Sequence, residues 1–394
     1  LSVYGLVRDL KPFYEIDLTS DTYEKELKKF DLGFTNLAPN ACSHISFLKI
    51  DIEGEVASYG GKLKEYFNDL NISKNNFFTD VSNYISYERG QPTHCYDAKK
   101  IGNMISLEII EEEKNFQTLL EKEIIIKGRN LVFSQDGEVI NLAGVMGNKN
   151  TSCSINTKSV IVECAHFNSE EITGKSVKYD IKSDAAHKFE RGVDPLCHED
   201  VLRRFIKIVS EHANIKNLEI YSETTVDYRE IKIPFDVNKI RNILGIHEDE
   251  KAFKEYLLKL GFGILDNKII VPSYRNDIKN INDIAEEIAR VIGYDNILAT
   301  PLEMSPVNSI TDIKILEQNI KAFLINNGFF EVVNNPFIDV EENHAIKVDN
   351  PLDSNRKYIR TSLEKSLIEN LLYNERRQQD SIKLFEISDV YSID

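Results

Sequence analysis

The chain has 394 residues, of which 42% are hydrophobic and 28% are charged, and its formal net charge at pH 7 is −16. This length exceeds one ordinary domain and indicates two or three separate cores. No apolar run approaches the roughly eighteen residues of a membrane-spanning helix, so we expect a soluble protein. The acidic balance argues against a protein that grips nucleic acid along its whole length, so any RNA contact has to be local.

The five cysteines are widely and irregularly spaced, with no C-x-x-C pair: Cys42, Cys95, Cys153, Cys164 and Cys197. This spacing predicts neither a disulfide framework nor a zinc site and favours a cytoplasmic protein. The opening from Leu1 lacks the basic start and the apolar stretch of a signal peptide. We expect the native start to be missing, and we expect truncation at Asp394, which follows shortly after a predicted strand.

From about residue 40 to residue 220, short β-rich runs alternate with Gly, Asn and Asp turns. The β-rich runs lie at 106–110, 123–127 and 159–164. Helical patterns at 61–70 and 198–213 flank them. This alternation predicts one α+β domain.

The pattern changes at about residue 228. Helices are predicted over 236–244, 249–260 and 280–292, and each is followed by a glycine that can end it: Gly245, Gly261 and Gly293. Two short apolar runs flank Asp266-Asn267, which is a hairpin signal. Together these elements predict a compact winged-helix-like module.

The last stretch opens after Pro301 and Pro306 with an amphipathic helix, for which Thr311 is the predicted cap and Gly328 the predicted end. Two β-rich runs follow with a helical pattern between them, at 329–335, 383–393 and 362–377 respectively. This pattern predicts a further α+β region.

Two glycine-containing segments of the first domain are candidates for a site. GQPTHCYD (residues 90–97) places His94 two residues after a proline, in a predicted turn after an aromatic strand, where it is presented and not buried. A loop histidine on its own is more often an ordinary surface residue. NLAGVMGNKNTS (residues 141–152) puts Gly144 and Gly147 in a short turn where backbone can approach a ligand closely, although a tight turn alone explains it.

Two further segments carry polar groups in an unusual setting. Glu163 stands in the apolar run VIVECAHF, where strand alternation predicts an inward carboxylate that needs a partner, and a salt bridge is the structural alternative. Residues 179–195 combine small side chains with charged ones: Ser183, Ala185, Ala186, His187, Glu190 and Arg191. The charged end of this segment is also compatible with a solvated helix face.

Four carboxylates gather at the third helix of the module: Asp277, Asp283, Glu286 and Glu287. The last three are spaced i, i+3, i+4 and share a helix face. Carboxylates without histidine or cysteine suit Mg²⁺. Acidic residues near a helix N-terminus also favour the macrodipole, and the residues alone favour this second interpretation.

In this order and at these spacings, GQPTHCYD, LAGVMGN, VIVECAHFN and SDAAHKFERGVDP resemble the editing domain of bacterial phenylalanyl-tRNA synthetase beta subunits. VPSYRNDI and EEIARVIGYDNI are similar to the next conserved blocks of that family, and LEKSLIENLLYNERRQQDSIKLFEISDVY resembles its non-catalytic class II domain. The resemblance covers nearly the whole chain. It implies an N-terminal remnant (1–39), an editing domain (40–225), the small module (226–300) and a truncated class II synthetase-like domain with an antiparallel sheet (301–394).

The resemblance also implies site residues. The family's editing histidine falls on His94, its pocket glycine on Gly147, and the glutamate that recognises the tyrosine hydroxyl on Glu163. The threonine and alanine of the pocket wall fall on Ser183 and Ala185. In the family the four carboxylates ligate a Mg²⁺ shared with the alpha subunit, which reverses the preference stated above.

Ser183 replaces the family threonine and keeps a hydroxyl, and one other position departs more strongly from the family pattern. Ser73 stands where the family has an arginine, with Lys74 beside it, so we expect the contact with the tRNA end to be weaker or rebuilt.

The implied function is that of a fragment of an (αβ)₂ phenylalanine–tRNA ligase that hydrolyses Tyr-tRNA(Phe), with water as the attacker and His94 orienting the substrate. ATP and phenylalanine would bind the alpha subunit, so the fragment would not charge tRNA alone. One alternative is a free-standing editing hydrolase, which would not need residues 228–394. Another is a transcription regulator, but the third module helix begins with acidic residues, so we expect no DNA partner.

Overall fold

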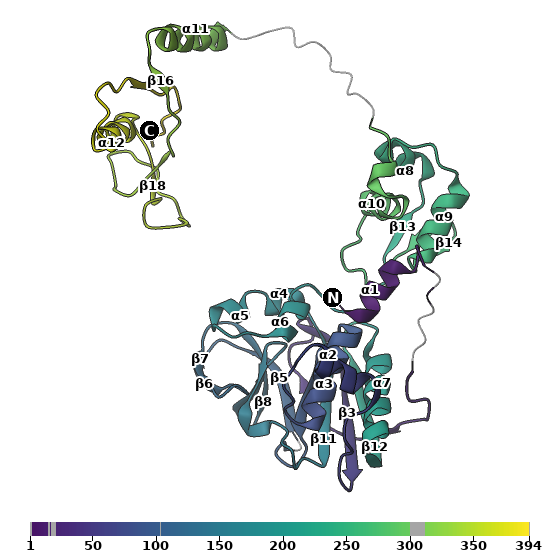
Figure 1. Cartoon of the computed structure of the whole chain (residues 1–394). Helices are drawn as coiled ribbons and strands as arrows, with labels where there is room; N and C mark the ends of the chain where they lie inside the picture. Colours follow the sequence, from purple (N-terminus) through teal and green to yellow (C-terminus); the bar gives the residue numbers. More distant parts are fainter. Residues whose placement is uncertain (1, 15, 17–20, 103, 300–311, 394) are drawn as a thin grey trace. The chain divides into compact units, whose positions relative to one another are not determined.

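The computed structural model describes residues 2–14, 16, 21–102, 104–299 and 312–393. The chain divides into two compact units, Leu1–Thr300 and Pro301–Asp394 (Figure 1). Both units contain helices and strands, so the predicted α+β class is confirmed. Among the described helices, none combines the length and the apolar character that a membrane crossing requires.

The larger domain of the first unit is built on two five-stranded sheets and a hairpin. The first sheet has the order β1 (Lys28–Lys29), β12 (Asn214–Thr224), β3 (Cys42–Glu53), β11 (Ser159–Phe167), β4 (Thr93–Asp97). The second has the order β10 (Met146–Gly147), β9 (Glu138–Leu142), β8 (Asn130–Gln135), β5 (Met104–Ile110), β2 (Gly33–Asn36). The hairpin joins β6 (Lys114–Gln117) to β7 (Glu123–Ile126). The three predicted β-rich runs are therefore strands.

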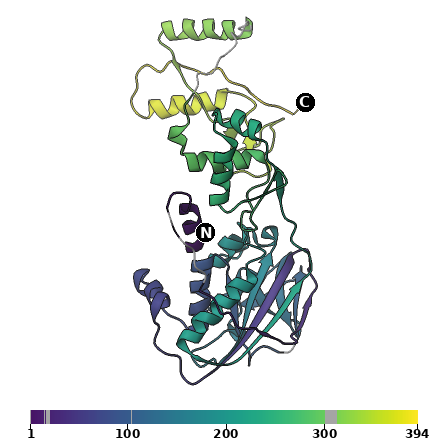
Figure 2. The ribbon, with the colours of Figure 1, turned by 90° about the vertical axis from the view of Figure 1, so that its right-hand side faces the viewer.

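The helices that precede the small module are α1 (Val3–Leu10), α2 (Gly61–Asp69), α3 (Phe77–Arg89), α4 (Ser169–Ile172), α5 (Lys175–Lys178), α6 (Asp184–Phe189) and α7 (His198–His212), with a 3-10 turn at Lys149–Thr151. Side chains of α2, α3 and α7 share one apolar core with the first sheet. A second core joins the opposite face of that sheet to the second sheet, where Phe47 and Phe133 meet with ring centroids 6.4 Å apart. The first sheet is therefore the middle of three layers (Figure 2).

Strand β11 lies at the centre of this arrangement. Val160, Val162 and Cys164 belong to the core under the helices, and alternate residues belong to the core between the sheets. A strand covered on both faces reads as a nearly continuous apolar run. Glu163 is the polar exception, and its place in the alternation directs it between the two sheets.

The helix α1 makes contacts with two parts of the unit. Arg89 of α3 lies over the ring of Tyr4, with its guanidinium carbon 3.9 Å from the ring centroid. Arg8 lies 3.7 Å from the centroid of the Tyr274 ring, and Asp9 is 3.4 Å from Arg290.

The small module follows the prediction closely. It contains α8 (Val237–Leu244), α9 (Glu250–Lys259), α10 (Ile281–Ile292), a 3-10 turn (Tyr294–Asn296) and a sheet ordered β13 (Lys232–Pro234), β15 (Lys268–Ile270), β14 (Gly263–Leu265). Asp266 and Asn267 have φ of 48° and 56°, the two positive values that a tight type I′ hairpin turn requires. The predicted helices and hairpin are confirmed. Strand β13 was not predicted, because a three-residue run ending in proline carries almost no signal.

The second unit contains α11 (Asp312–Asn326), α12 (Glu364–Glu375) and four two-residue strands: β16 (Phe330–Glu331), β17 (Phe337–Ile338), β18 (Tyr358–Ile359) and β19 (Leu384–Phe385). Both predicted helices are confirmed, while the cap at Thr311 and the prolines 301 and 306 lie outside the described residues. The described part contains one antiparallel pair, β17 with β18, while β16 pairs with β19 in parallel. Phe330 and Val333 remain 71% and 84% exposed, so the β-rich pattern has little core to pack against.

Candidate functional site

The structure brings His94 and Glu163 together. Strand β4 pairs antiparallel with β11, and the register places His94 directly opposite Glu163. Residues directly opposite each other in such a pair project from the same face of the sheet. The segments GQPTHCYD and VIVECAHF therefore meet at one place between the two sheets.

The local surroundings of His94 differ from the prediction. His94 lies in β4 and not in a turn, and the segment before it is the helix α3 and not an aromatic strand. The residues of α3 explain the error, because Phe77, Val81, Tyr84 and Glu88 recur on one buried face at helical spacing. His94 is half-buried, not presented on the surface.

Gly147 closes the site from the second sheet. A Cβ at this position would lie 2.2 Å from Cε1 and 2.6 Å from Nε2 of His94. The imidazole therefore rests directly against the backbone of Gly147, at a distance that no side chain permits. Gly144 has a different role, since its φ of +68° places it in the turn between β9 and β10.

The carboxylate of Glu163 is held by two neutral donors. Its Oε2 accepts hydrogen bonds from the Tyr96 hydroxyl at 2.7 Å and from Asn141 Nδ2 at 3.2 Å. Asn141 Nδ2 also lies 2.8 Å from the Tyr96 hydroxyl. Glu163 is 4% exposed and has no ion pair within the described ranges, so the salt-bridge interpretation does not hold here. Sequence reasoning missed Tyr96 and Asn141, although both stand inside the quoted segments.

Burial shifts both titratable groups of the site toward their neutral forms. It raises the pKa of Glu163 to about 7, against the lowering effect of the hydrogen bonds from Tyr96 and Asn141. It lowers the pKa of His94 to about 4, so the imidazole is neutral at physiological pH. His94 Nε2 is buried, and no described residue supplies it with a hydrogen bond. This nitrogen is where an incoming polar group would find a partner.

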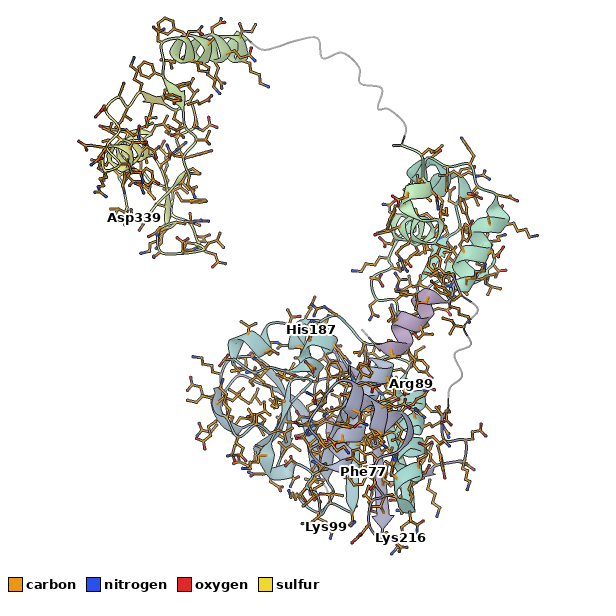
Figure 3. All side chains as sticks on the ribbon, in the orientation of Figure 1. Phe77, Arg89, Lys99, His187, Lys216 and Asp339 are labelled. Atoms are coloured by element: carbon orange, nitrogen blue, oxygen red, sulfur yellow. The ribbon has the colours of Figure 1, made fainter. Side chains whose placement is uncertain are left out.

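Ser183 and Ala185 stand at the start of α6. Ser183 is its N-cap: Oγ accepts from the backbone N–H of Ala186 at 3.1 Å and donates to the carbonyl of Val145 at 2.6 Å. This second bond ties α6 to the turn that precedes Gly147. Ala185 packs half-buried against the core between the sheets, whereas His187 is on the surface (Figure 3).

Ser73 and Lys74 lie exposed between α2 and α3. The Lys74 ammonium is 4.4 Å from the centroid of the Tyr59 ring and 6.0 Å from that of Phe67, side chains of the core under the helices. These contacts place Lys74 on the other side of the first sheet from Glu163. They give no support to Lys74 as a substitute for the family arginine.

Three of the four carboxylates of the small module, Asp277, Asp283 and Glu287, are engaged with other groups. Arg275 binds Asp277 at 2.6 Å and Glu287 at 2.6 Å, and Arg290 binds Glu287 at 2.8 Å. Asp283 accepts from the backbone N–H groups of Lys279 and Asn280, which caps α10. In the part of the chain that the structure describes, no group of three or more His, Cys, Asp or Glu residues is arranged to hold a metal ion.

Two of these carboxylates differ in exposure. Glu286 is exposed, whereas Glu287 is 5% exposed and paired with two arginines. The magnesium site stays a prediction. Arg275 stands inside the quoted VPSYRNDI segment, yet its pairing with α10 has no local signal.

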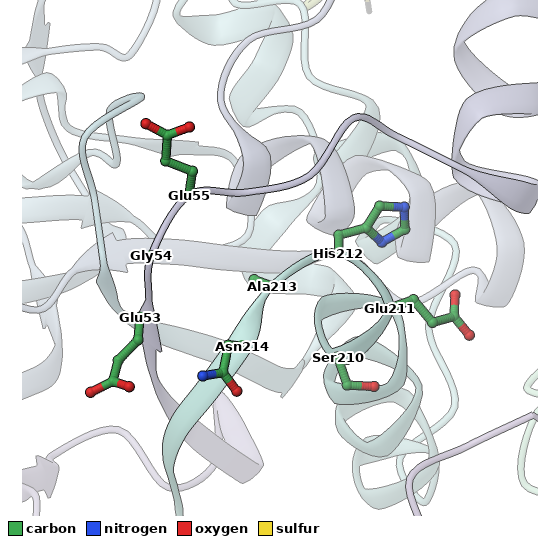
Figure 4. A pocket seen from close by; sticks show the side chains of 8 residues that line it. All are labelled: Glu53, Gly54, Glu55, Ser210, Glu211, His212, Ala213 and Asn214. Atoms are coloured by element: carbon green, nitrogen blue, oxygen red, sulfur yellow. The ribbon is translucent and has the colours of Figure 1, made fainter.

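A separate surface hollow of about 700 Å³ lies where β3 ends and α7 meets β12, and it is lined by Glu53, Gly54, Glu55, Ser210, Glu211, His212, Ala213 and Asn214 (Figure 4). His212 has both ring nitrogens engaged, at 2.8 Å from the Ile208 carbonyl and 3.0 Å from the Gly60 N–H. None of the predicted site residues lines this hollow. All five cysteines are free thiols, as the spacing predicted.

Three family models match consecutive parts of the chain. They are the B3/4 domain at residues 54–214, the tRNA synthetase B5 domain at 233–294 and the phenylalanyl tRNA synthetase beta chain CLM domain at 297–394. The last two cover the region that a free-standing editing hydrolase would not need.

Curated relatives match over most of the chain. The phenylalanine–tRNA ligase beta subunit of Ehrlichia canis is 29% identical over 84% of this chain and 43% of its own length. Those of Francisella tularensis and Haemophilus ducreyi are 26% and 28% identical, each over 98% of this chain and 51% of its own length. A solved N-terminal fragment of the Pyrococcus horikoshii phenylalanyl-tRNA synthetase beta subunit aligns with 69% of this chain and 78% of its own at 14% identity, with a TM-score of 0.33 that is too low to carry an argument. The chain spans about half the length of the curated relatives it matches, and it belongs to the family of phenylalanine–tRNA ligase beta subunits.

Proposed function

We propose that the domain at residues 40–225 removes tyrosine from mischarged tRNA(Phe), as the editing part of a phenylalanine–tRNA ligase. One observation carries the proposal. His94 and Glu163 lie opposite each other on paired strands, and Gly147 of the second sheet rests against the His94 ring. Three of the five residues that the family resemblance assigns to editing therefore converge from three separate segments.

Selectivity follows from the buried carboxylate. Tyrosine differs from phenylalanine by one hydroxyl, and an ionised carboxylate offers about four acceptor positions. Tyr96 and Asn141 donate to one oxygen of Glu163, so a bound phenylalanine does not leave the carboxylate without partners. The preference then comes from the additional hydrogen bond that only the tyrosine hydroxyl donates.

Hydrolysis in this site uses water as the nucleophile. Ser183 donates to the Val145 carbonyl and caps α6, so it is not paired with His94 as an activated nucleophile. The depressed pKa of His94 makes it a weak base at neutral pH. Its unpartnered Nε2 serves to orient the ester or the attacking water, with positioning supplying most of the rate.

The first test compares two esters on the assembled enzyme. A ligase that contains this chain is expected to deacylate Tyr-tRNA(Phe) roughly 10- to 100-fold faster than Phe-tRNA(Phe), the effect of one hydrogen bond to a charged group. Deacylation of both purified aminoacyl-tRNAs is followed under single-turnover conditions. Equal rates on the two substrates would overturn the proposed specificity.

The chain acts together with partners in this proposal. An alpha subunit would supply the ATP and phenylalanine sites of a cytoplasmic (αβ)₂ enzyme that charges tRNA(Phe). The CLM match at residues 297–394 supports this, as do the apolar side chains that α11 leaves exposed, among them Leu316 at 60% and Phe323 at 66%. Exposed apolar side chains gathered on one helix are typical of a surface that a partner covers.

We also propose that Mg²⁺ binds Asp277, Asp283, Glu286 and Glu287 only when the alpha subunit adds a ligand. Oxygen donors fit this ion, but Arg275 holds two of the four carboxylates in the free chain. Binding therefore requires displacement of that arginine, so the isolated chain is expected to bind Mg²⁺ weakly.

Association with the alpha subunit tests the magnesium proposal. Glu286→Gln changes an exposed side chain, so the variant should fold normally while its affinity for the alpha subunit falls. Chelation of Mg²⁺ by EDTA should weaken the wild type in the same way. Glu287→Gln is a poor variant for this purpose, because it breaks buried pairs with Arg275 and Arg290. Unchanged affinity in both Glu286→Gln and the chelated wild type would overturn the magnesium proposal and leave Asp277, Asp283 and Glu287 with ion pairing and helix capping alone.

A further inference from the structure

Two residues to which the family resemblance gives no role surround Glu163. Tyr96 stands two residues after His94 in β4, so its side chain projects from the same face of the sheet. Asn141 comes from β9 of the opposite sheet. Both are buried, at 0% and 3% exposure, and both donate to the same carboxylate oxygen. The contact between Asn141 Nδ2 and the Tyr96 hydroxyl, at 2.8 Å, closes a triangle of three polar groups inside an apolar core.

We infer that Tyr96 and Asn141 are specificity-determining positioning residues, which hold the Glu163 carboxylate ionised and aimed so that it accepts the hydroxyl of a tyrosyl ester. This inference rests on the proposed editing function. It adds that the recognition residue does not work alone, and that the strength of the tyrosine preference depends on two neighbouring side chains.

Glu163 depends on these two donors because an isolated charge is costly inside an apolar core. A carboxylate taken out of water stays ionised only where donors or cations stabilise it. The described titratable groups around Glu163 are His94 and Tyr96 from β4 and the thiols of Cys42, Cys95 and Cys164. Burial keeps the imidazole neutral and the thiols protonated, so none of these groups supplies a positive charge at neutral pH. Hydrogen bonds from Tyr96 and Asn141 are the influences that favour the charged form.

Protonation would change what Glu163 recognises. A protonated carboxyl group has an O–H of its own and accepts a phenol hydrogen bond less strongly than a carboxylate does. The preference for tyrosine should therefore be highest where Glu163 is ionised and should decline as the pH falls through its pKa of about 7. Removing the Tyr96 hydroxyl takes away an influence that lowers this pKa, so the decline should begin at a higher pH.

The test uses the assembled enzyme and the conservative variant Tyr96→Phe. Deacylation of Tyr-tRNA(Phe) and Phe-tRNA(Phe) is measured from about pH 6 to about pH 9, and the ratio of the two rates is plotted against pH. In the variant, the midpoint of this curve is expected to move by about one pH unit or more toward alkaline pH. The tyrosine preference should fall by roughly tenfold near neutral pH and recover at the alkaline end.

Tyr179→Phe is the matched control. Tyr179 is also a buried tyrosine of the core between the sheets, but its hydroxyl donates to Asn130 Oδ1 at 2.9 Å and does not reach Glu163. Its variant should keep the wild-type curve. Asn141→Ser shortens the second donor and should shift the midpoint in the same direction as Tyr96→Phe, so the inference does not depend on one variant.

The outcomes separate the two proposals. A wild type without tyrosine preference at any pH would overturn the proposed function itself. A wild type with the preference and a Tyr96→Phe variant with the same curve would overturn only this inference. A stronger tyrosine preference in Tyr96→Phe at all pH values would also overturn it, because the Tyr96 hydroxyl would then be competing with the substrate for the carboxylate.

Discussion

Gly147→Ala is expected to lower the hydrolysis of Tyr-tRNA(Phe) by roughly 100-fold, the effect of displacing a catalytic group by about 1 Å. The added Cβ would lie 2.2 Å from Cε1 of His94, so the imidazole has to move. The ring also packs edge-on against Tyr96, with centroids 4.4 Å apart, which limits where it can go. Single-turnover deacylation measures the loss directly.

The effect of Gly147→Ala should be steric and local. Gly147 is not among the glycines with positive φ, so its backbone conformation is open to alanine. Gly60→Ala is the control, because Gly60 has a φ of −122° and nothing within 4 Å of the position of its Cβ. We expect that variant to keep its activity. Full activity in Gly147→Ala would mean that the position of His94 is not important for hydrolysis.

Local pattern was sufficient for the elements whose contacts are close in sequence. The three helices of the small module were predicted with their ends, because each carries a polar cap or a terminating glycine, such as Asp236 and Gly245 for α8. The hairpin at Asp266-Asn267 followed from two residues that accept positive φ. In these cases the residue that carries the signal lies next to the helix end or turn that it determines.

The pairing of the strands could not be predicted from local sequence patterns. β11 lies between β3 and β4, and β1 pairs with β12 from the far end of the domain. Which strands pair with each other depends on the packing of the whole domain. The proline and glycine around His94 favoured a turn, but pairing with β11 makes residues 93–97 a strand. The same pairing leaves His94 half-buried, whereas the sequence pattern had presented it in a turn.

The candidate site also contains residues that the sequence indicated and residues that it did not. Resemblance supplied His94, Gly147 and Glu163, whereas the residues that control them were missed. Tyr96 could have been found from its position two residues after His94, once residues 93–97 are recognised as a strand. Asn141 and Arg275 reach their partners across a sheet interface and from a loop to a helix. No spacing rule in one sequence indicates contacts of that kind.

Stability should also depend on Glu163. Burial raises its pKa from 4.5 to about 7, so the folded protein binds the proton more tightly than the unfolded chain. The contribution of this group to stability is fully present below about pH 4.5 and is lost as the pH rises through about 7. A glutamine at this position does not titrate, so that component of the pH dependence should be absent from Glu163→Gln.

Glu163→Ala is expected to reduce the preference for Tyr-tRNA(Phe) by roughly 10- to 100-fold, while slow hydrolysis of both esters remains. The variant also leaves the Tyr96 hydroxyl without its buried acceptor, which costs about 1–3 kcal/mol of folding free energy, whereas the Asn141 amide keeps its hydrogen bond to the Tyr96 oxygen. Glu163→Gln separates the two effects, because it keeps an acceptor oxygen in place but removes the charge. Both deacylation rates and thermal unfolding are measured for the two variants. A Glu163→Ala protein that is destabilised but keeps its full preference for tyrosine would show that Glu163 supports the core between the sheets and does not read the substrate.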